Sequence, residues 1–197
     1  MHSARLPSSD GYRTGLRRSP GADRGALVRF LSENVFPFHV IPRPTAEDAN
    51  RAIEAGHYDG REHATLWARD PDGTIIGVVR LDDLDDDTPM VDLRLAEAQR
   101  GRGLGAKVLA AATDYVFSTM PITNRFEGQT REDNVAMRRT FLRCGWVKEA
   151  HYRDGWPIEG QAPLASVAYS VLRRDWESGT STPVNWDDDP EVAALSR

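Results

Sequence analysis

The sequence has 197 residues, of which 40% are hydrophobic and 28% charged, proportions that are ordinary for a soluble globular protein of one domain. The formal net charge of −5 at pH 7 argues against general nucleic-acid binding. No apolar run approaches the ~20 residues that span a bilayer, so we expect no membrane segment.

The single cysteine, Cys144, limits both the compartment and the metal chemistry. One cysteine cannot form an intrachain disulfide and leaves no cluster for a structural zinc site, so we expect no bound metal. The N-terminal residues include arginines but lack the apolar core of a secretory signal. Together these features favour a reducing, cytoplasmic compartment.

The N-terminal part of the chain is expected to contain one disordered segment and two helices. Residues 1–24 are rich in Ser, Gly, Arg and Pro, which predicts disorder. A short helix is expected to begin with residues 25–31 and to end near residues 36–39. A second is expected over 46–55, where Thr45 can cap the start and Gly56 can end the helix.

Three extended segments follow. Residues 63–69 and 74–81 have the composition of strands, and Asp70-Pro71-Asp72-Gly73 between them is a strong turn signal. An acidic loop, residues 82–87, then leads to the alternating segment 90–95. We therefore expect three antiparallel strands in succession.

The most informative segment of the chain is Gln99-Arg100-Gly101-Arg102-Gly103-Leu104-Gly105-Ala106. It lies where the last of these strands turns into a helix expected over 103–118. Glycines let the backbone approach a ligand closely, and the first turn of a helix offers free amides and the positive end of a dipole. Arg100 and Arg102 add cationic donors suited to phosphate oxygens. The segment is therefore predicted to hold a pyrophosphate, although it matches neither the P-loop nor the dinucleotide pattern.

The second half of the chain is expected to complete a sheet. The predicted elements are a strand, a helix and two closing strands, over residues 122–130, 134–143, 146–152 and 166–172. Trp156 and Pro157 are placed in the loop between the closing strands. The polar residues 177–197 are expected to form a flexible acidic tail.

Three motifs in this order resemble the GNAT superfamily of acetyl-CoA-dependent N-acetyltransferases. Arg100-Gly101-Arg102-Gly103-Leu104-Gly105 resembles its Arg/Gln-x-x-Gly-x-Gly/Ala motif, and segment 134–146 is similar to its Asn-x-x-Ser…Tyr-x-x-x-Gly-Phe helix. Segments 147–153 and 169–176 look like the closing strands of the ribosomal-protein N-terminal acetyltransferase (RimJ/RimL-like) subgroup. The resemblance implies a GNAT domain over residues 25–176. Its fold would be mixed α/β, with a mostly antiparallel central sheet, a splayed central strand pair and flanking helices.

The resemblance also implies a site for acetyl-CoA as co-substrate. The strand before the glycine-rich segment would pair its backbone with the pantetheine amides, the next amides would hold the pyrophosphate, and Asn134 would hydrogen-bond the pantetheine arm. Asn134 could also act only as a helix cap, since Asn is favoured there. The predicted cofactor-binding residues are Leu93, Arg94, Leu95, Arg100, Gly101, Arg102, Gly103, Leu104, Gly105, Ala106 and Asn134.

The implied reaction is direct attack of a primary amine on the acetyl thioester, with CoA thiolate as the leaving group. Because a primary amine is mostly protonated at neutral pH, a base must accept a proton, directly or through water. The candidate catalytic residues are Asp92 and Glu127, although Asp92 could simply be a polar partner of Arg94. His39 and His151 are alternatives, because histidine changes charge near neutral pH.

Several positions depart from the family pattern. Phe141 stands where the family often has a general-acid tyrosine, and Met137 stands at the serine position, so neither can donate a proton. Catalysis could proceed without an acid, or use Cys144 or a water. Ala165 replaces an aspartate that is usual in the subgroup, which weakens the transfer of substrate identity. A non-catalytic acyl-CoA-binding regulatory module is therefore an alternative function.

In this family the first two helices and their loop wall the acceptor site. Here that implies Phe36, Phe38 and His39 as substrate-binding residues, although a phenylalanine could instead belong to the core. The subgroup resemblance favours the N-terminal amine of a protein or peptide as acceptor. The acidic loop 82–87 could instead attract a small cationic amine, such as a polyamine or an aminoglycoside. A homodimer is common in the subgroup and is a further expectation.

Overall fold

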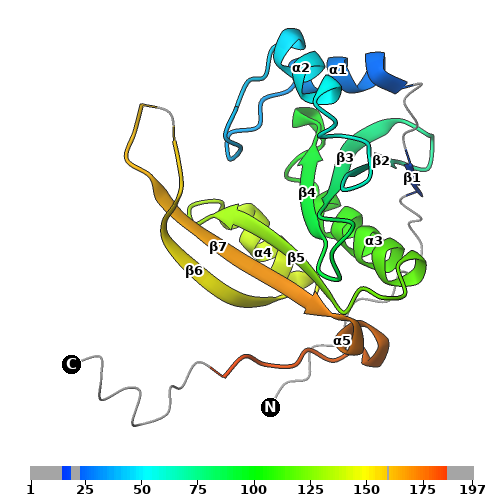
Figure 1. Ribbon diagram of the computed structural model, residues 1–197, viewed down its shortest axis with the longest axis vertical. Helices are drawn as coiled ribbons and strands as arrows, with labels where there is room; N and C mark the ends of the chain where they lie inside the picture. The colour runs from blue at the N-terminus through cyan, green and yellow to red at the C-terminus, as the bar shows by residue number, and fades with distance from the viewer. Residues whose placement is uncertain (1–14, 19–22, 159, 186–197) are drawn as a thin grey trace.

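The computed structural model of the chain describes residues 15–18, 23–158 and 160–185. Within them seven strands form one sheet in the order β1-β2-β3-β4-β5-β7-β6 (Figure 1). Strands β4 and β5 are parallel to each other, and the other neighbouring pairs are antiparallel. The strands are β1 (Gly15–Arg18), β2 (Ala64–Arg69), β3 (Ile75–Asp82), β4 (Met90–Leu95), β5 (Arg125–Arg131), β6 (Val147–Trp156) and β7 (Leu164–Leu172).

Five α-helices and a short 3-10 helix accompany these strands within the described part. They are α1 (Arg24–Ser32), α2 (Ala46–Glu54), η2 (Glu97–Gln99), α3 (Leu104–Thr119), α4 (Val135–Arg143) and α5 (Arg173–Ser178). Thr45 caps α2 in a capping box with Asp48, which confirms the predicted start of that helix. Among these helices, none combines the length and the apolar character needed to cross a membrane.

The helices cover both faces of the sheet where β2 and β3 lie. Because successive side chains of a strand point to opposite faces, neighbouring residues of β3 enter different cores. Val79 and Leu81 join the cluster that includes α3, whereas Val78 joins the cluster that includes α1 and α2. The predicted mixed α/β fold with a mostly antiparallel sheet is therefore confirmed.

Strands β4 and β5 separate almost as soon as they meet. They share a single register pair, Met90 with Glu127, after which β4 continues to Leu95 paired with β3 alone. Figure 1 shows the two halves of the sheet diverging, with the β6–β7 hairpin extending on one side of the gap and α1 and α2 on the other. This is the splayed central strand pair implied by the family resemblance.

The predicted helices and strands are found, most with small shifts of their ends, although the first helix ends at Ser32 rather than near residues 36–39, and three elements were not predicted. These are β1, η2 and α5, which are short and carry little hydrophobic periodicity. β1 lies within residues 1–24, for which disorder was expected, and it pairs with β2. The rest of that segment, 1–14 and 19–22, and residues 186–197 of the expected tail lie outside the described residues.

The placement of Trp156 in a loop was wrong. Strand β6 extends to Trp156, where it pairs with Leu164 of β7. The register shifts between Tyr152 and Trp156, so the strand is irregular there and Asp154 has a positive φ of 54°. An irregular strand of mixed polar residues shows no period of two, and its pairing with β7 determines how far it extends.

Candidate active site

The gap between β4 and β5 contains a cavity of about 520 Å³. One wall comes from residues 33–45, which connect α1 and α2 and are called the acceptor loop below. The other walls come from α2, β3, β4, β5, α4 and the end of β6. The predicted site residues that line it are Phe38, His39, Asp92, Leu93, Arg94 and Asn134. Residues predicted for the acceptor and for acetyl-CoA therefore meet in one cavity.

The glycine-rich segment has the geometry of an anion site. Gly101 and Gly103 adopt positive φ values of 72° and 75°, and Gly103 occupies the N-cap position of α3 without a side chain to cap the helix. The amides of residues 101–103 find no hydrogen-bond partner inside the described ranges. A Cβ atom at either glycine would meet nothing within 4 Å, so the space beside them is open. Free N–H groups at the positive end of a helix dipole fit a pyrophosphate.

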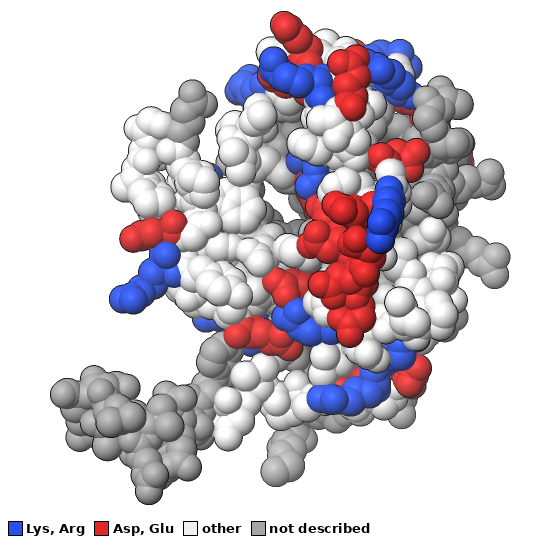
Figure 2. Space-filling view, in the orientation of Figure 1, with Lys and Arg blue, Asp and Glu red and all other residues white. Residues whose placement is uncertain are grey.

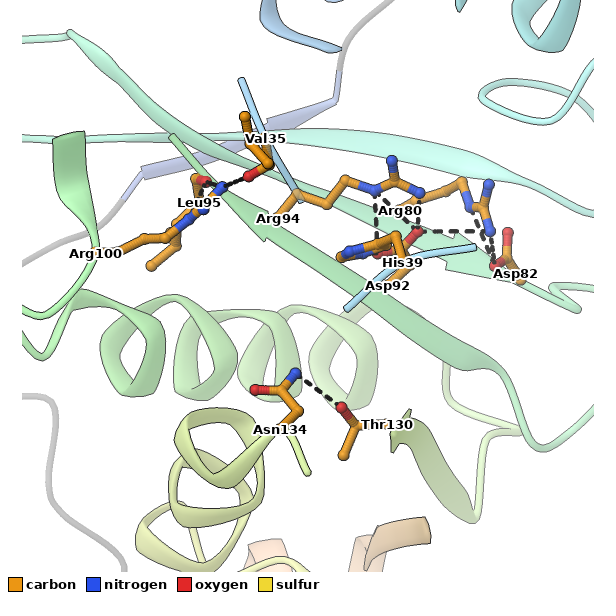
Figure 3. Close-up of polar contacts among 10 residues, drawn as sticks. All are labelled: Val35, His39, Arg80, Asp82, Asp92, Arg94, Leu95, Arg100, Thr130 and Asn134. Atoms are coloured by element: carbon orange, nitrogen blue, oxygen red, sulfur yellow. Dashed lines mark hydrogen bonds and ion pairs between the residues drawn. The ribbon is translucent and has the colours of Figure 1, made fainter. Parts of the chain in front are cut away.

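The side chain of Arg100 is engaged elsewhere. Its guanidinium donates to the carbonyl of Leu95 at 3.0 and 3.2 Å and to the carbonyl of Val35 (Figure 3). It also lies over the ring of Phe36, 5.5 Å from the centroid, and burial lowers the pKa of Arg100. The prediction that this guanidinium serves the phosphates is corrected, because its donors bind backbone carbonyls. Arg102 is exposed and donates to Gln99 at 2.7 Å.

Two of the three β4 residues expected to contact the pantetheine arm lie on the free edge of this strand. Beyond Met90 this strand has no register partner on the side of β5, which leaves an extended edge. Leu93 and Arg94 line the cavity along that edge, whereas Leu95 does not and packs against the core. An unpaired strand edge is the natural partner for a ligand that carries amide groups.

Asn134 caps helix α4, which is one of the two roles expected for this residue. Its side-chain oxygen accepts the N–H of Met137 at 3.2 Å, and its side-chain nitrogen donates to the hydroxyl of Thr130 at 2.9 Å (Figure 3). The same side chain lines the cavity. Capping and a contact with acetyl-CoA are therefore compatible at this position.

The main ion pairs of the cavity connect β4 with β3 and the acceptor loop. Asp92 accepts from Arg94 at 2.8 Å and contacts Nε2 of His39 at 2.9 Å, while Arg80 lies 3.7 Å away (Figure 3). Burial raises the pKa of Asp92, but Arg94 and His39 outweigh it and hold the pKa well below its ordinary value of 3.8. A carboxylate held ionised in this way accepts protons poorly at neutral pH. Asp92 therefore fits a positioning role better than the predicted role of base.

His39 has one ring nitrogen in use and one unused. Because the ionised carboxylate of Asp92 can only accept, Nε2 of His39 is assigned as the donor, and the neutral ring then carries its lone pair on Nδ1. Nδ1 is buried and has no partner in the described part of the chain. The ring of Phe36 packs edge-on against the imidazole, with 5.6 Å between centroids. His39 therefore lines the cavity with one ring nitrogen bound to Asp92 and a second, buried nitrogen that no described residue uses.

The other two candidate bases do not reach the cavity. The carboxylate of Glu127 is paired with Arg125 and accepts from Gln129, a residue of the cavity wall, at 3.0 Å. His151 is half exposed on β6 and lies 3.8 Å from Glu132. Neither is among the residues that line the cavity.

The proposed replacement for the missing general acid does not reach the cavity either. The thiol of Cys144 donates to the carbonyl of Ala106 at 3.3 Å, and burial raises its pKa to about 11. Phe141 does line the cavity and stacks on Tyr169 with 4.9 Å between centroids. A Cβ at Gly128 would lie 2.7 Å from the Phe141 ring, so the glycine is what allows this packing. Among the described residues, no group of three or more metal-ligating side chains could hold a metal ion.

The two phenylalanines of the acceptor loop have different roles. Phe36 is 2% exposed, belongs to the core beneath α1 and α2, and does not line the cavity, so its prediction as a substrate contact was wrong. Phe38 does line the cavity and lies under the guanidinium of Arg131, 5.0 Å from the ring centroid. The alternative that a phenylalanine of this loop belongs to the core is therefore correct for Phe36, whereas Phe38 lines the cavity.

The polar residues of the cavity wall that the sequence did not single out include Tyr58, Arg80 and Trp156, while Asp82 was named only as part of the acidic loop 82–87. Burial raises the pKa of Tyr58, over whose ring Arg80 lies. The indole N–H of Trp156 is buried without an acceptor in the described residues. The sequence did contain a signal for Arg80 and Asp82, which carry opposite charges two residues apart on a predicted strand. In the sheet Arg80 is the register partner of Asp92 on β4, so the three charges lie together.

Replacing Asp92 by Asn is expected to lower the free energy of unfolding by about 3 kcal/mol at pH 7, because Arg94, 13% exposed, loses its buried partner. Since the pKa of Asp92 is lower in the folded chain, its contribution is present above the unfolded pKa and is lost as the pH falls through the folded value. Urea titrations between pH 7 and pH 3 measure this difference, which should shrink below about pH 4. Glu54→Gln, which removes an exposed pair with Arg24, is the control and should cost at most about 1 kcal/mol. A loss of the same size in both variants would contradict the prediction.

Comparisons with known proteins agree with this geometry. The family described as acetyltransferase (GNAT) domain matches residues 13–147. The fold is similar to the spermidine/spermine N-acetyltransferase SpeG from Vibrio cholerae in complex with manganese ions, with a TM-score of 0.67, 16% identity, and coverage of 83% of this chain and 95% of that chain. The structure of the Vibrio cholerae spermidine N-acetyltransferase with CoA and spermine gives a TM-score of 0.68 and 16% identity, over 83% and 97% of the two chains. No curated protein sequence matches the chain.

The family match spans more than half of the chain, and it includes the splayed strands and the glycine-rich segment. The low identities to the two solved structures support the fold alone. The chain belongs to the GNAT family of acetyltransferases and is an acetyl-CoA-dependent N-acetyltransferase.

Proposed function

We propose that this enzyme acetylates the N-terminal amine of a protein or peptide, with His39 as the catalytic base and Asp92 as its positioning partner. The observation that carries this proposal is the pairing of the two residues in the cavity wall. Nε2 of His39 is bound to Asp92, while Nδ1 is buried without a partner in the described residues. The arrangement resembles other carboxylate–imidazole pairs, in which the carboxylate sets the tautomer of the base.

Acetyl-CoA supplies a thioester, whose carbonyl carbon is attacked by the amine. The nitrogen–carbon bond forms, the carbon–sulfur bond breaks, and the proton released by the amine passes to Nδ1 of His39, directly or through water. Asp92 offsets the positive charge that develops on the imidazole. CoA leaves as a thiolate, and since an ordinary thiol has a pKa of about 8.5, this leaving group needs little help from an acid. Phe141 and Met137 are therefore compatible with catalysis.

The geometry of the other wall supports the acetyl-CoA contacts that we propose. The free amides of residues 101–103 and the first turn of α3 would hold the pyrophosphate, with Arg102 beside them. The unpaired edge of β4 at Leu93 and Arg94 would pair with the pantetheine amides. Asn134, which lines the cavity from α4, would contact the same arm from the opposite side.

Trp156 supports an acceptor that carries an oxygen atom near its amine. An indole N–H can only donate, and a buried donor without an acceptor costs about 1–3 kcal/mol. A peptide brings a carbonyl one residue from its N-terminal amine and can accept this hydrogen bond. A protonated polyamine has donors but no acceptor, so it would leave the Trp156 N–H unsatisfied. This favours the peptide acceptor that the RimJ/RimL-like resemblance suggests.

A polyamine acceptor has its own support. The β3–β4 hairpin carries the exposed aspartates Asp83, Asp85, Asp86 and Asp87, and the adjoining Asp82 lines the cavity. Figure 2 shows the acidic surface next to the hollow in this face of the molecule. Such a surface attracts cations, and the solved structures of similar fold include one that binds spermine. An aminoglycoside would combine positive charge with oxygen acceptors.

Turnover with matched acceptors tests the proposal. CoA release is measured with a tripeptide amide that has a free N-terminus, with spermidine and with an aminoglycoside. We expect the highest kcat/KM for the peptide. A higher kcat/KM for spermidine would contradict the peptide proposal and support a polyamine as the acceptor. No turnover with any amine, together with saturable acetyl-CoA binding, would favour the non-catalytic module.

Trp156→Phe, which removes the N–H and keeps most of the ring, is expected to lower kcat/KM for the peptide by about fivefold, the worth of one neutral hydrogen bond. The rate with spermidine, which cannot accept that bond, should change by less than about twofold. Both acceptors are measured side by side on the two proteins. An equal loss for both acceptors would show that Trp156 acts by packing, and would remove this argument for a peptide.

A further inference from the structure

Arg100 connects the glycine-rich segment to the acceptor loop. Its backbone belongs to that segment, but its guanidinium points to the end of β4 and donates to the carbonyls of Leu95 and Val35 (Figure 3). Val35 belongs to the acceptor loop, 65 residues earlier in the chain. One side chain therefore joins the segment expected to hold acetyl-CoA to the loop that carries His39.

The acceptor loop has two more anchors on the same part of β4 and η2. The side-chain oxygen of Asn34 accepts the backbone N–H of Glu97 at 2.7 Å. The ring of Phe36 lies under the guanidinium groups of Arg94 and Arg100, at 5.2 and 5.5 Å from its centroid. Because the two arginines share one ring, losing either would loosen the hold on Phe36.

Phe36 in turn determines where His39 lies. The backbone N–H of His39 donates to the carbonyl of Phe36 at 3.0 Å, and the two rings pack edge-on. The N–H of Phe36 donates to the carbonyl of Pro42 at 2.7 Å, which closes the loop. The position of the imidazole relative to Asp92 thus depends on contacts that begin at Arg100.

We infer that Arg100 is a positioning residue for catalysis: it fixes the acceptor loop against the end of β4, so that His39 stays on Asp92 beside the acetyl-CoA site. This inference rests on the proposed function of His39. The planar guanidinium suits the role, since it donates to two carbonyls in different directions while its face covers the Phe36 ring. A lysine would keep the charge but could not make all of these contacts together.

The test compares Arg100→Lys with Arg29→Lys, which changes an exposed arginine of α1 that precedes the same loop. For Arg100→Lys we expect kcat to fall at least tenfold, because a small displacement of a base is costly, while the calorimetric Kd for acetyl-CoA changes less than threefold. Arg29→Lys should leave both quantities unchanged. A loss of acetyl-CoA affinity as large as the fall in kcat would overturn the inference and would indicate that Arg100 binds the phosphates.

Amide hydrogen exchange gives a second readout that needs no turnover. In Arg100→Lys the amides of Phe36 and His39 should exchange about tenfold faster, whereas buried amides of α3, at Val108 and Leu109, should not change. Unchanged exchange at Phe36 and His39 would overturn the inference. If the wild type acetylates no amine, the proposed function fails, and the exchange rates alone then decide whether Arg100 fixes the loop.

Discussion

Replacing His39 by Asn is expected to lower kcat/KM for the amine by at least 100-fold at pH 7.5, within the range of about 10²–10⁴ that general-base catalysis contributes. The variant keeps a side-chain amide that can donate to Asp92 but loses the nitrogen that accepts the proton. Because His39 lies on the acceptor side of the cavity, the Kd for acetyl-CoA should stay within about threefold of that of the wild type. Steady-state kinetics and calorimetry on the same preparations measure both effects.

His151→Asn is the control, because this second candidate histidine is half exposed on β6 and does not line the cavity. Its kcat/KM should equal that of the wild type. In His39→Asn the amine must lose its proton to solvent, so the remaining rate should rise with pH across the whole range. Loss of activity in His151→Asn with full activity in His39→Asn would reverse the assignment.

The sequence predicted the site best where backbone conformation decides the geometry. Gly101 and Gly103 were singled out at a strand-to-helix corner because glycine lets the backbone approach a ligand closely, and both adopt the positive φ that glycine readily takes. Asn134 was expected at the start of a helix because its side chain can cap the first turn, and it does. These features depend on residues a few positions apart, which the sequence displays directly.

Side-chain directions across the sheet were harder to predict. Asp92 and Glu127 looked equivalent, as acidic residues on adjacent strands, yet only Asp92 lines the cavity. The difference arises because β4 and β5 share one register pair before they diverge, which sequence spacing does not reveal. Arg100 likewise sits in a phosphate-binding motif, but its partners Leu95 and Val35 are visible only once the acceptor loop is in place.

The family resemblance and the structure also assign different roles to the two phenylalanines of the acceptor loop. The resemblance placed Phe36 and Phe38 together on the acceptor wall, whereas the structure buries Phe36 beneath two arginines and leaves Phe38 to line the cavity. In the proposed mechanism, Phe36 acts through the position of His39 rather than through the substrate. Three aromatic residues, Phe38, Tyr58 and Trp156, line the cavity together with this loop.

Gly103→Asp is expected to weaken acetyl-CoA binding at least 100-fold, which is a larger effect on the co-substrate than any other substitution considered. The new carboxylate would stand at the N-cap of α3, beside the amides of residues 101–103, where it would repel a pyrophosphate and compete with it for the first-turn amides of the helix. The folded chain should survive the change. A Cβ at this glycine meets nothing within 4 Å, and Asp tolerates the left-handed conformation at a cost of about 1–2 kcal/mol.

Gly179→Asp is the matched control for this experiment. Gly179 has a φ of 69°, close to the 75° of Gly103, and its Cβ would also meet open space, but it follows α5 rather than opening α3. Both variants should therefore lose a similar amount of stability in urea titrations, and only Gly103→Asp should lose saturable acetyl-CoA binding by calorimetry. Wild-type affinity in Gly103→Asp would mean that the pyrophosphate does not rest on this helix start. Loss of binding in both variants would mean that destabilisation, rather than the anion site, accounts for the effect.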